Sequence, residues 1–237
     1  MRYAVYFTPS ADHPLTRAAA SWLGRDPRDP HVADPALTGS SPPIAPDIVS
    51  KPARYGFHAT MKAPFRLADG ATEAALRTML ADFTSSRRPI PLTLRIKPVG
   101  PFLAMVPKGD QQQIKSIEAA VHLPLEPFRA PLTQAEIARR KPETLTSLQR
   151  QMLERHGYPF VLDAFRFHMT LSNALPPDDL ARVQTIAQTH FADALAAPLA
   201  IDRLALFVEP QPDAPFMLRE EYTFAHTPVG VDAQTPA

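Results

Sequence analysis

Two short segments of this 237-residue chain share one pattern of polar and apolar side chains. Residues 55–62 read Tyr-Gly-Phe-His-Ala-Thr-Met-Lys, and residues 165–172 read Phe-Arg-Phe-His-Met-Thr-Leu-Ser. Because apolar and polar residues alternate in both, each segment is predicted to be a β-strand with one face in the core. The polar faces carry His58, Thr60 and Lys62 in the first strand, and Arg166, His168, Thr170 and Ser172 in the second. Any fold for this chain has to contain two strands that each bury their apolar face and leave the polar face accessible.

The segments that follow the two motifs also repeat. In each half we predict a motif strand, then a helix, then a two-stranded hairpin, with the two histidines 168 − 58 = 110 residues apart. The predicted elements are a helix at 72–83 and strands at 90–99 and 102–106 in the first half, and a motif strand at 161–174, a helix at 178–196 and strands at 201–209 and 216–225 in the second. This order indicates an α+β fold with an internal duplication.

We expect one domain over residues 1–237. Its N-terminal lobe covers about 1–121 and opens with a strand at 3–8 and a helix at 15–23, and a proline-rich connection at 25–50 is expected to form a partly ordered flap. A connecting helical segment covers about 122–158, with helical pattern at 134–155 interrupted before Pro142. The C-terminal lobe covers about 159–226, and 227–237 are expected to be a disordered tail.

Composition limits the classes of partner. The 25 Lys and Arg nearly balance the 24 Asp and Glu, so the net charge of +1 argues against a protein that coats long nucleic acids or membranes. The absence of cysteine excludes disulfides and thiolate chemistry. The first residues reach Thr8-Pro9 before a signal-type apolar run develops, and no apolar run is long enough for a membrane helix. We therefore expect a cytoplasmic protein, a monomer, with no membrane partner.

The doubled His/Thr face suggests acid–base chemistry on a phosphate. Histidine titrates near pH 6.5, so a pair of imidazoles can hold one base and one acid near neutrality. One ring would deprotonate the attacking oxygen and the other would protonate the leaving oxygen, while Thr60 and Thr170 bind non-bridging oxygens. Lys62 and Arg166 would neutralise charge. Ser172 shares their face, and Tyr55 has the wrong parity, so it reaches the cleft only through a bend near Gly56.

Each of these residues also has a structural explanation. A single His-x-Thr on a strand is usually structural, but two copies with matching core faces favour catalysis. The run Arg139-Arg140-Lys141 is most often a solvated helix face, although it could line the mouth of a cleft. The remaining histidines lack partners at ligand spacing and no HExxH occurs, so we expect no metal site and no cofactor. They are His13, His31, His122, His156, His190 and His226. No phosphate-cradling glycine loop is present.

The paired segments His58-Ala59-Thr60-Met61 and His168-Met169-Thr170-Leu171 resemble the two His-x-Thr-x signatures of the 2H phosphoesterase superfamily. The longer context, 54–65 with 157–171, is similar to a branch of phosphonate-metabolism-associated proteins (DUF1045-like). The resemblance implies two pseudo-symmetric lobes, each an antiparallel sheet with outer helices, around a central cleft, the 2H phosphoesterase or RNA ligase-like fold. It also implies that His58 and His168 are the acid/base pair and that Thr60 and Thr170 bind phosphate.

These observations predict a metal-independent phosphoesterase that hydrolyses a cyclic phosphate or small phosphodiester. The resemblance to phosphonate-metabolism-associated proteins implies that it acts in phosphonate metabolism. The expected substrate is a small phosphorylated metabolite or nucleotide. One alternative is an RNA-end 2′,3′-cyclic phosphodiesterase, against which the near-neutral charge argues mildly. Another is a non-catalytic module that binds phosphorylated nucleotides, which would not need both imidazoles. Pseudo-symmetry leaves open which histidine is the acid.

Overall fold

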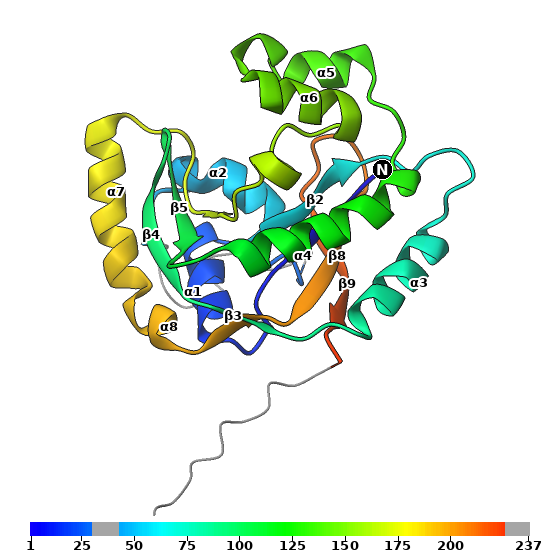
Figure 1. Ribbon diagram of the computed structural model, residues 1–237. Helices are drawn as coiled ribbons and strands as arrows, with labels where there is room; N and C mark the ends of the chain where they lie inside the picture. The colour runs from blue at the N-terminus through cyan, green and yellow to red at the C-terminus, as the bar shows by residue number, and fades with distance from the viewer. Residues whose placement is uncertain (30–42, 226–237) are drawn as a thin grey trace, which may run out of the picture.

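The computed structural model describes residues 1–29 and 43–225 (Figure 1). Its elements alternate along the chain in the α+β manner that the sequence predicts. The strands are β1 Arg2–Phe7, β2 Ala59–Phe65, β3 Ile90–Leu92, β4 Leu94–Val99, β5 Phe102–Pro107, β6 Met169–Thr170, β7 Leu199–Ile201, β8 Arg203–Glu209 and β9 Met217–Thr223. The helices are α1 Pro14–Leu23, α2 Pro46–Tyr55, α3 Glu73–Thr84, α4 Gln112–His122, α5 Gln134–Arg139, α6 Ser147–His156, α7 Pro177–His190 and α8 Ala192–Ala196, with a 3₁₀ turn, η2, at Leu123–Phe128.

Seven strands form one antiparallel sheet in the order β4-β5-β6-β2-β1-β8-β9. A second, two-stranded sheet pairs β3 with β7. The two motif strands, β2 and β6, lie next to each other near the middle of the large sheet. The second motif strand therefore pairs with β5, from the hairpin that follows the first motif, while β2 is linked through β1 to the hairpin that follows the second. The two sequence halves exchange strands.

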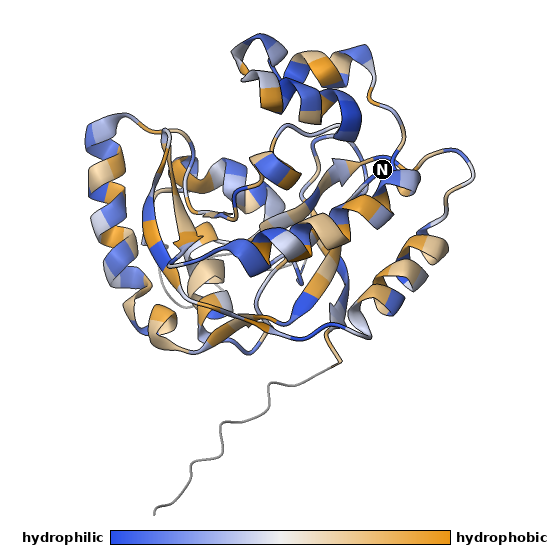
Figure 2. Ribbon diagram, viewed as in Figure 1, coloured by the Kyte–Doolittle hydropathy of each residue, from blue (hydrophilic) through white to orange (hydrophobic). Residues whose placement is uncertain are grey.

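The helices cover the sheet with their apolar faces. Helix α7 packs on β4 and β5, and α3 packs on β8 and β9 at the opposite end of the molecule (Figure 1). Both helices carry hydrophilic and hydrophobic residues (Figure 2), as expected for helices with one face on a core. The side chain of Trp22, on α1, is fully buried and donates a hydrogen bond from Nε1 to the carbonyl oxygen of Leu171, 2.8 Å away. This bond ties α1 to the second motif.

Several predicted elements are confirmed. Thr72 caps α3 through a hydrogen bond from the main-chain N–H of Ala75, and β4 and β5 form the predicted hairpin across Gly100-Pro101. The helical pattern at 134–155 becomes two short helices, α5 and α6, because Lys141 and Pro142 interrupt it. These two helices stand above the sheet, close to one end of β2 (Figure 1).

Other predictions are wrong in their extent. Tyr55 ends helix α2 and does not begin a strand, because Gly56 adopts a φ of 77° there and turns the chain. The second motif strand is only two residues long, although the alternation predicts it over 161–174. Half of the predicted flap at 25–50, residues 30–42, and the predicted tail at 227–237 lie outside the described residues, and the end of the predicted flap is helical because α2 begins at Pro46. Within the described residues, no helix combines the length and apolar character needed to cross a bilayer.

Candidate active site

The two motifs meet across a single antiparallel contact. Ala59 pairs with Met169, and both side chains are fully buried. The same register places His58 opposite Thr170 and Thr60 opposite His168, on the other face of the sheet. Each histidine therefore faces the threonine of the other motif, and the four polar side chains form one patch.

Both imidazoles are held in the same way. The Nδ1 atom of His58 lies 2.9 Å from the carbonyl oxygen of Gly56, and Nδ1 of His168 lies 2.8 Å from the carbonyl oxygen of Arg166. A carbonyl oxygen only accepts hydrogen bonds, so each Nδ1 carries the proton and each neutral ring has its free lone pair on Nε2. In each case the acceptor lies two positions before the histidine, so the repeated sequence produces a repeated tautomer.

A cavity of about 590 Å³ lies over this patch and is lined by all four motif residues, His58, Thr60, His168 and Thr170. Three tyrosines complete its walls: Tyr6, Tyr55 and Tyr158. The Tyr6 ring stacks on His58 with ring centroids 3.9 Å apart, and the Tyr55 ring lies 6.0 Å from His58. The sequence predicts that Tyr55 reaches the cleft through a bend at Gly56, and the structure places it on the cavity wall directly before that glycine.

Burial beneath Tyr6 lowers the pKa of His58 from 6.5 to about 4, with a smaller lowering contribution from the nearby charge of His168, while the hydrogen bond to Gly56 opposes the shift. His58 is therefore neutral at pH 7. The phenol of Tyr6 is fully buried, and burial raises its pKa well above 10, so it stays protonated. Near neutral pH, His58 and Tyr6 therefore contribute no charge to the cavity.

The positive charge of the cavity comes from four arginines that the sequence motifs do not include. Arg2 and Arg54 both pair with the buried carboxylate of Glu209, and Arg54 also lies 3.3 Å from Asp213. Arg139 and Arg140, on and after α5, have no carboxylate partner among the described residues. Arg140 lies over the Tyr158 ring at 5.0 Å. Two cations are thus available to an anion, and the charge run at 139–140 is the only signal in the sequence that pointed to them.

Lys62 is not part of this cavity. Between Thr60 and Lys62 strand β2 advances two residues while β1 advances one, and this bulge reverses the alternation beyond it. Ala63 consequently lines the cavity, whereas the Lys62 side chain is 1% exposed and pairs with Glu126. The parity argument for Lys62 depended on a regular strand, and the strand is irregular at that point.

Arg166 and Ser172 also lie outside the cavity that the two histidines line. Arg166 lines a neighbouring cavity of about 680 Å³ that contains Arg95, Lys97 and Lys115, and His168 borders both cavities. Ser172 is buried, where its hydroxyl accepts a hydrogen bond from the N–H of Leu103 and donates one to the carbonyl oxygen of Asn173. The structure therefore gives Ser172 a structural contact and leaves Arg166 at the rim beside His168.

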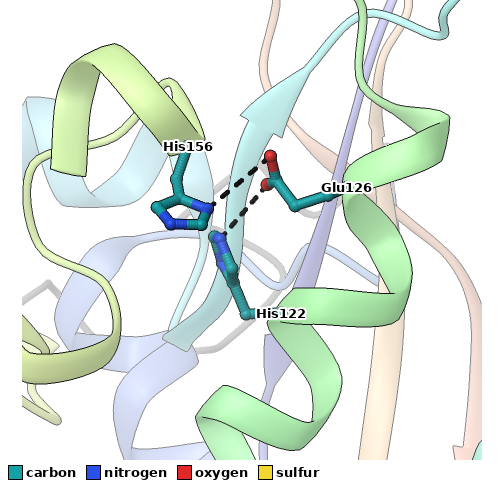
Figure 3. Close-up of side chains that lie close together, drawn as sticks. All are labelled: His122, Glu126 and His156. Atoms are coloured by element: carbon teal, nitrogen blue, oxygen red, sulfur yellow. Dashed lines mark ion pairs between the residues drawn. The ribbon is translucent and has the colours of Figure 1, made fainter.

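A second polar cluster lies beneath β2, on the side of Lys62. The side chains of His122, Glu126 and His156 point toward one another, from the end of α4, from η2 and from the end of α6 (Figure 3). Their ligand atoms lie within 4.8 Å of one another. Sequence spacing did not pair His122 with His156, because 34 residues and a tertiary contact separate them.

Comparison with known proteins gives one family and two curated relatives. Residues 60–217 match the family model described as "Protein of unknown function (DUF1045)". A protein named "Ribose 1,5-bisphosphate phosphokinase PhnN" from Janthinobacterium sp. (strain Marseille) is 40% identical over 94% of this chain. A protein of the same name from Laribacter hongkongensis (strain HLHK9) is 36% identical over 92% of it. The chain spans about half the length of these curated relatives, 51% and 50% respectively.

Proposed function

The chain belongs to the DUF1045 family, and from this membership and the paired histidines of the cleft we propose that it is a phosphoesterase of the 2H type. Its substrate is a cyclic phosphate or a small phosphodiester, which it hydrolyses by acid–base catalysis. The observation that carries the proposal is the repeated tautomer: both rings donate Nδ1–H to a carbonyl oxygen two residues earlier, and both rings line one cavity. The pairing of β2 with β6 in one sheet brings one motif from each half of the sequence to this cavity, which supports the proposal.

The two histidines have different roles in this mechanism. His58, whose pKa is about 4, is neutral at pH 7 and accepts the proton of the attacking water at Nε2. His168 donates a proton from Nε2 to the leaving oxygen. Because His58 is neutral at pH 7, it takes the role of the base, and the role of the acid goes to the other histidine of the pair, His168. As the oxygen–phosphorus bond to water forms, the bond to the leaving oxygen breaks, and one proton moves at each end.

The other cavity residues stabilise the charge on phosphorus oxygens. The hydroxyls of Thr60 and Thr170 donate hydrogen bonds to the non-bridging oxygens. Arg139 and Arg140 supply the positive charge, since no carboxylate among the described residues neutralises them. This mechanism uses groups of the chain alone.

The names of the relatives bear on the substrate. Both names describe a kinase and include ribose 1,5-bisphosphate, which is a doubly phosphorylated pentose. This chain contains no Gly-Lys pair, and so lacks the GxxxxGK[ST] loop in which many kinases hold nucleotide phosphates. We therefore do not assign the kinase activity to it. The named sugar, and the resemblance to phosphonate-metabolism proteins, favour a cyclic phosphate of a phosphorylated ribose.

The test is a panel of cyclic phosphates incubated with the wild-type protein, His58→Ala, His168→Ala and the control His13→Asn. The panel contains ribose cyclic phosphates with and without a second phosphate, nucleoside 2′,3′-cyclic phosphates and an RNA oligonucleotide with a cyclic end. We expect hydrolysis of a ribose cyclic phosphate, reduced by about 10²–10⁴-fold in each motif variant. The control should retain activity, because an asparagine side chain can replace the helix cap that His13 provides.

Other outcomes decide between the alternatives. Preferred cleavage of the oligonucleotide would indicate an RNA-end phosphodiesterase. Binding of the panel without turnover by the wild-type protein would favour a non-catalytic binding module and would refute the proposal.

A further inference from the structure

Unsatisfied polar atoms are concentrated in one place in this molecule. Among the described residues, six buried side-chain nitrogen or oxygen atoms have no hydrogen-bond partner, and four of them surround the cluster of His122, Glu126 and His156. They are Glu118 Oε1, His122 Nδ1, Arg129 Nε and His156 Nδ1. Buried polar atoms are normally satisfied. Of these four atoms, His156 Nδ1 is the one that faces Glu126 and could bind a cation directly, whereas the other three mark the polar surroundings of the cluster.

The cluster has the spacing of a metal site. His122 Nε2 lies 3.1 Å from Glu126 Oε1, and His156 Nδ1 lies 3.7 Å from Glu126 Oε2 (Figure 3). Donors that bind one zinc ion tetrahedrally, at about 2.0–2.2 Å each, lie about 3.3–3.5 Å from one another. The two measured distances end on different oxygens of Glu126, and with one ligand atom per residue the three donors lie within 4.8 Å of one another, so small side-chain movements would close them around one ion. Three protein donors leave a fourth position for water.

His122 also has a carboxylate behind it, as ligating histidines in metal sites commonly do. On its far side, Nδ1 lies 3.7 Å from Glu118 Oε1, and both side chains are 1% exposed. In metal sites a ligating histidine commonly donates its second N–H to a carboxylate, which holds the ring and its tautomer. Glu118, His122 and Glu126 succeed one another at i, i+4 and i+8 along α4 and η2, so one helical face supplies the carboxylate, the imidazole and the second ligand.

From this geometry we propose that His122, Glu126 and His156 bind a divalent transition metal ion, zinc in the first place, at a site distinct from the catalytic cleft. Two imidazoles and a carboxylate suit zinc better than magnesium or calcium, which prefer oxygen ligands alone. Lys62 is the competitor. Its ammonium group pairs with Glu126 and lies 3.4 Å from His122 Nε2, so it fills the place of the cation when no metal is bound. Arg129 also pairs with Glu126, with Nη2 3.1 Å from Oε2, so a metal ion has to displace this second cation or share the carboxylate with it.

The site joins two parts of the fold. His156 ends α6, and Gly157 and Tyr158 follow it, so the ligand lies two residues before a wall of the catalytic cavity. The other two ligands lie on α4 and η2, beside β2. A bound metal would fix the end of α6 against the body of the protein. Its role is therefore to hold the segment that carries Tyr158.

The experiment measures metal binding directly. Chelator-treated and desalted protein is titrated with Co²⁺, followed by its visible absorption, and Zn²⁺ is then added in competition. We expect one Co²⁺ per chain in the wild-type protein and in His13→Asn, displaced by Zn²⁺. His156→Gln and Glu126→Gln should weaken binding by about 100-fold or more. Lys62→Met should tighten it, since it removes the competing cation.

Two further measurements distinguish a loss of metal binding from misfolding of a variant. Near-ultraviolet circular dichroism identifies variants that keep the native packing, and only those are compared. Zn²⁺ should raise the thermal midpoint of the wild-type protein but not that of His156→Gln. The proposal is overturned if the wild-type protein gives no stoichiometric Co²⁺ spectrum, if His156→Gln and Glu126→Gln bind as tightly as His13→Asn, or if only Lys62→Met binds the ion.

Discussion

Acidification from pH 6.5 to pH 4 is expected to destabilise this protein through one identified side chain, His58. Its pKa is about 4 in the folded protein, against 6.5 for a solvated histidine. Between these values the unfolded chain takes up a proton that the folded chain refuses, so the free energy of unfolding falls as the pH is lowered. The difference of about 2.5 pKa units, at about 1.36 kcal/mol each, sets an upper limit of about 3–4 kcal/mol. The ring borders an open cavity, so water reduces this value.

The assay combines two readouts. Urea unfolding at intervals from pH 7 to pH 4 is measured for the wild-type protein and for His58→Gln, which cannot titrate. The difference between the two curves should shrink as the pH falls and level off near pH 4. The subtraction also removes the opposite contribution of Glu118, whose pKa burial raises to about 7.

Nuclear magnetic resonance of the labelled imidazoles gives the pKa of His58 itself. A value at or above 6.5 in the free protein, or parallel unfolding curves for the two proteins, would refute the reasoning. In that case burial beneath Tyr6 does not control the ring, and the assignment of His58 as the base loses its support.

Two further predictions concern hydroxyl groups. Thr60→Val and Thr170→Val each remove one hydrogen-bond donor at nearly constant volume, and kcat should fall by about 10²-fold or more on the substrate identified by the panel; an unchanged kcat would remove that hydroxyl from the mechanism. Ser172→Ala leaves the buried N–H of Leu103 without its acceptor, so urea unfolding should show a loss of about 1–3 kcal/mol with little change in kcat. A loss near zero would mean that water replaces the hydroxyl.

The repeated His-x-Thr pattern predicted two strands whose polar faces carry His58, Thr60, His168 and Thr170, and these four side chains line one cavity. The pairing of the two strands within a single sheet was not predicted, because the resemblance implied a separate sheet for each lobe. Alternation gave the right face for His58 and Thr60, because strand β2 is regular up to that point. It failed for Lys62, because the bulge after Thr60 depends on pairing with β1, which the sequence of β2 does not reveal. A local pattern predicts a side-chain direction only as far as the strand stays regular.

The arginines of the cavity were harder to find, for a different reason. Arg2 and Arg54 reach it through their shared contact with Glu209, which lies more than 150 residues away from either. The cluster of His122 and His156 was missed in the same way. Contacts of this kind arise from tertiary packing, through the order of strands for Glu209 and through the packing of α4, η2 and α6 for the histidines, and no single segment of sequence carries their signal.

The exchange of strands has a consequence for how the protein can be assembled. A polypeptide cut between the motifs, in the stretch around 134–146, would give two fragments that each hold only part of the large sheet: β6 would lose β5, and β8 would lose β1. Neither fragment could complete its hydrogen bonding alone, and both should aggregate or stay unfolded when made separately. Produced together, they should recover a native complex by complementation, and the two motif histidines would come together only in that complex.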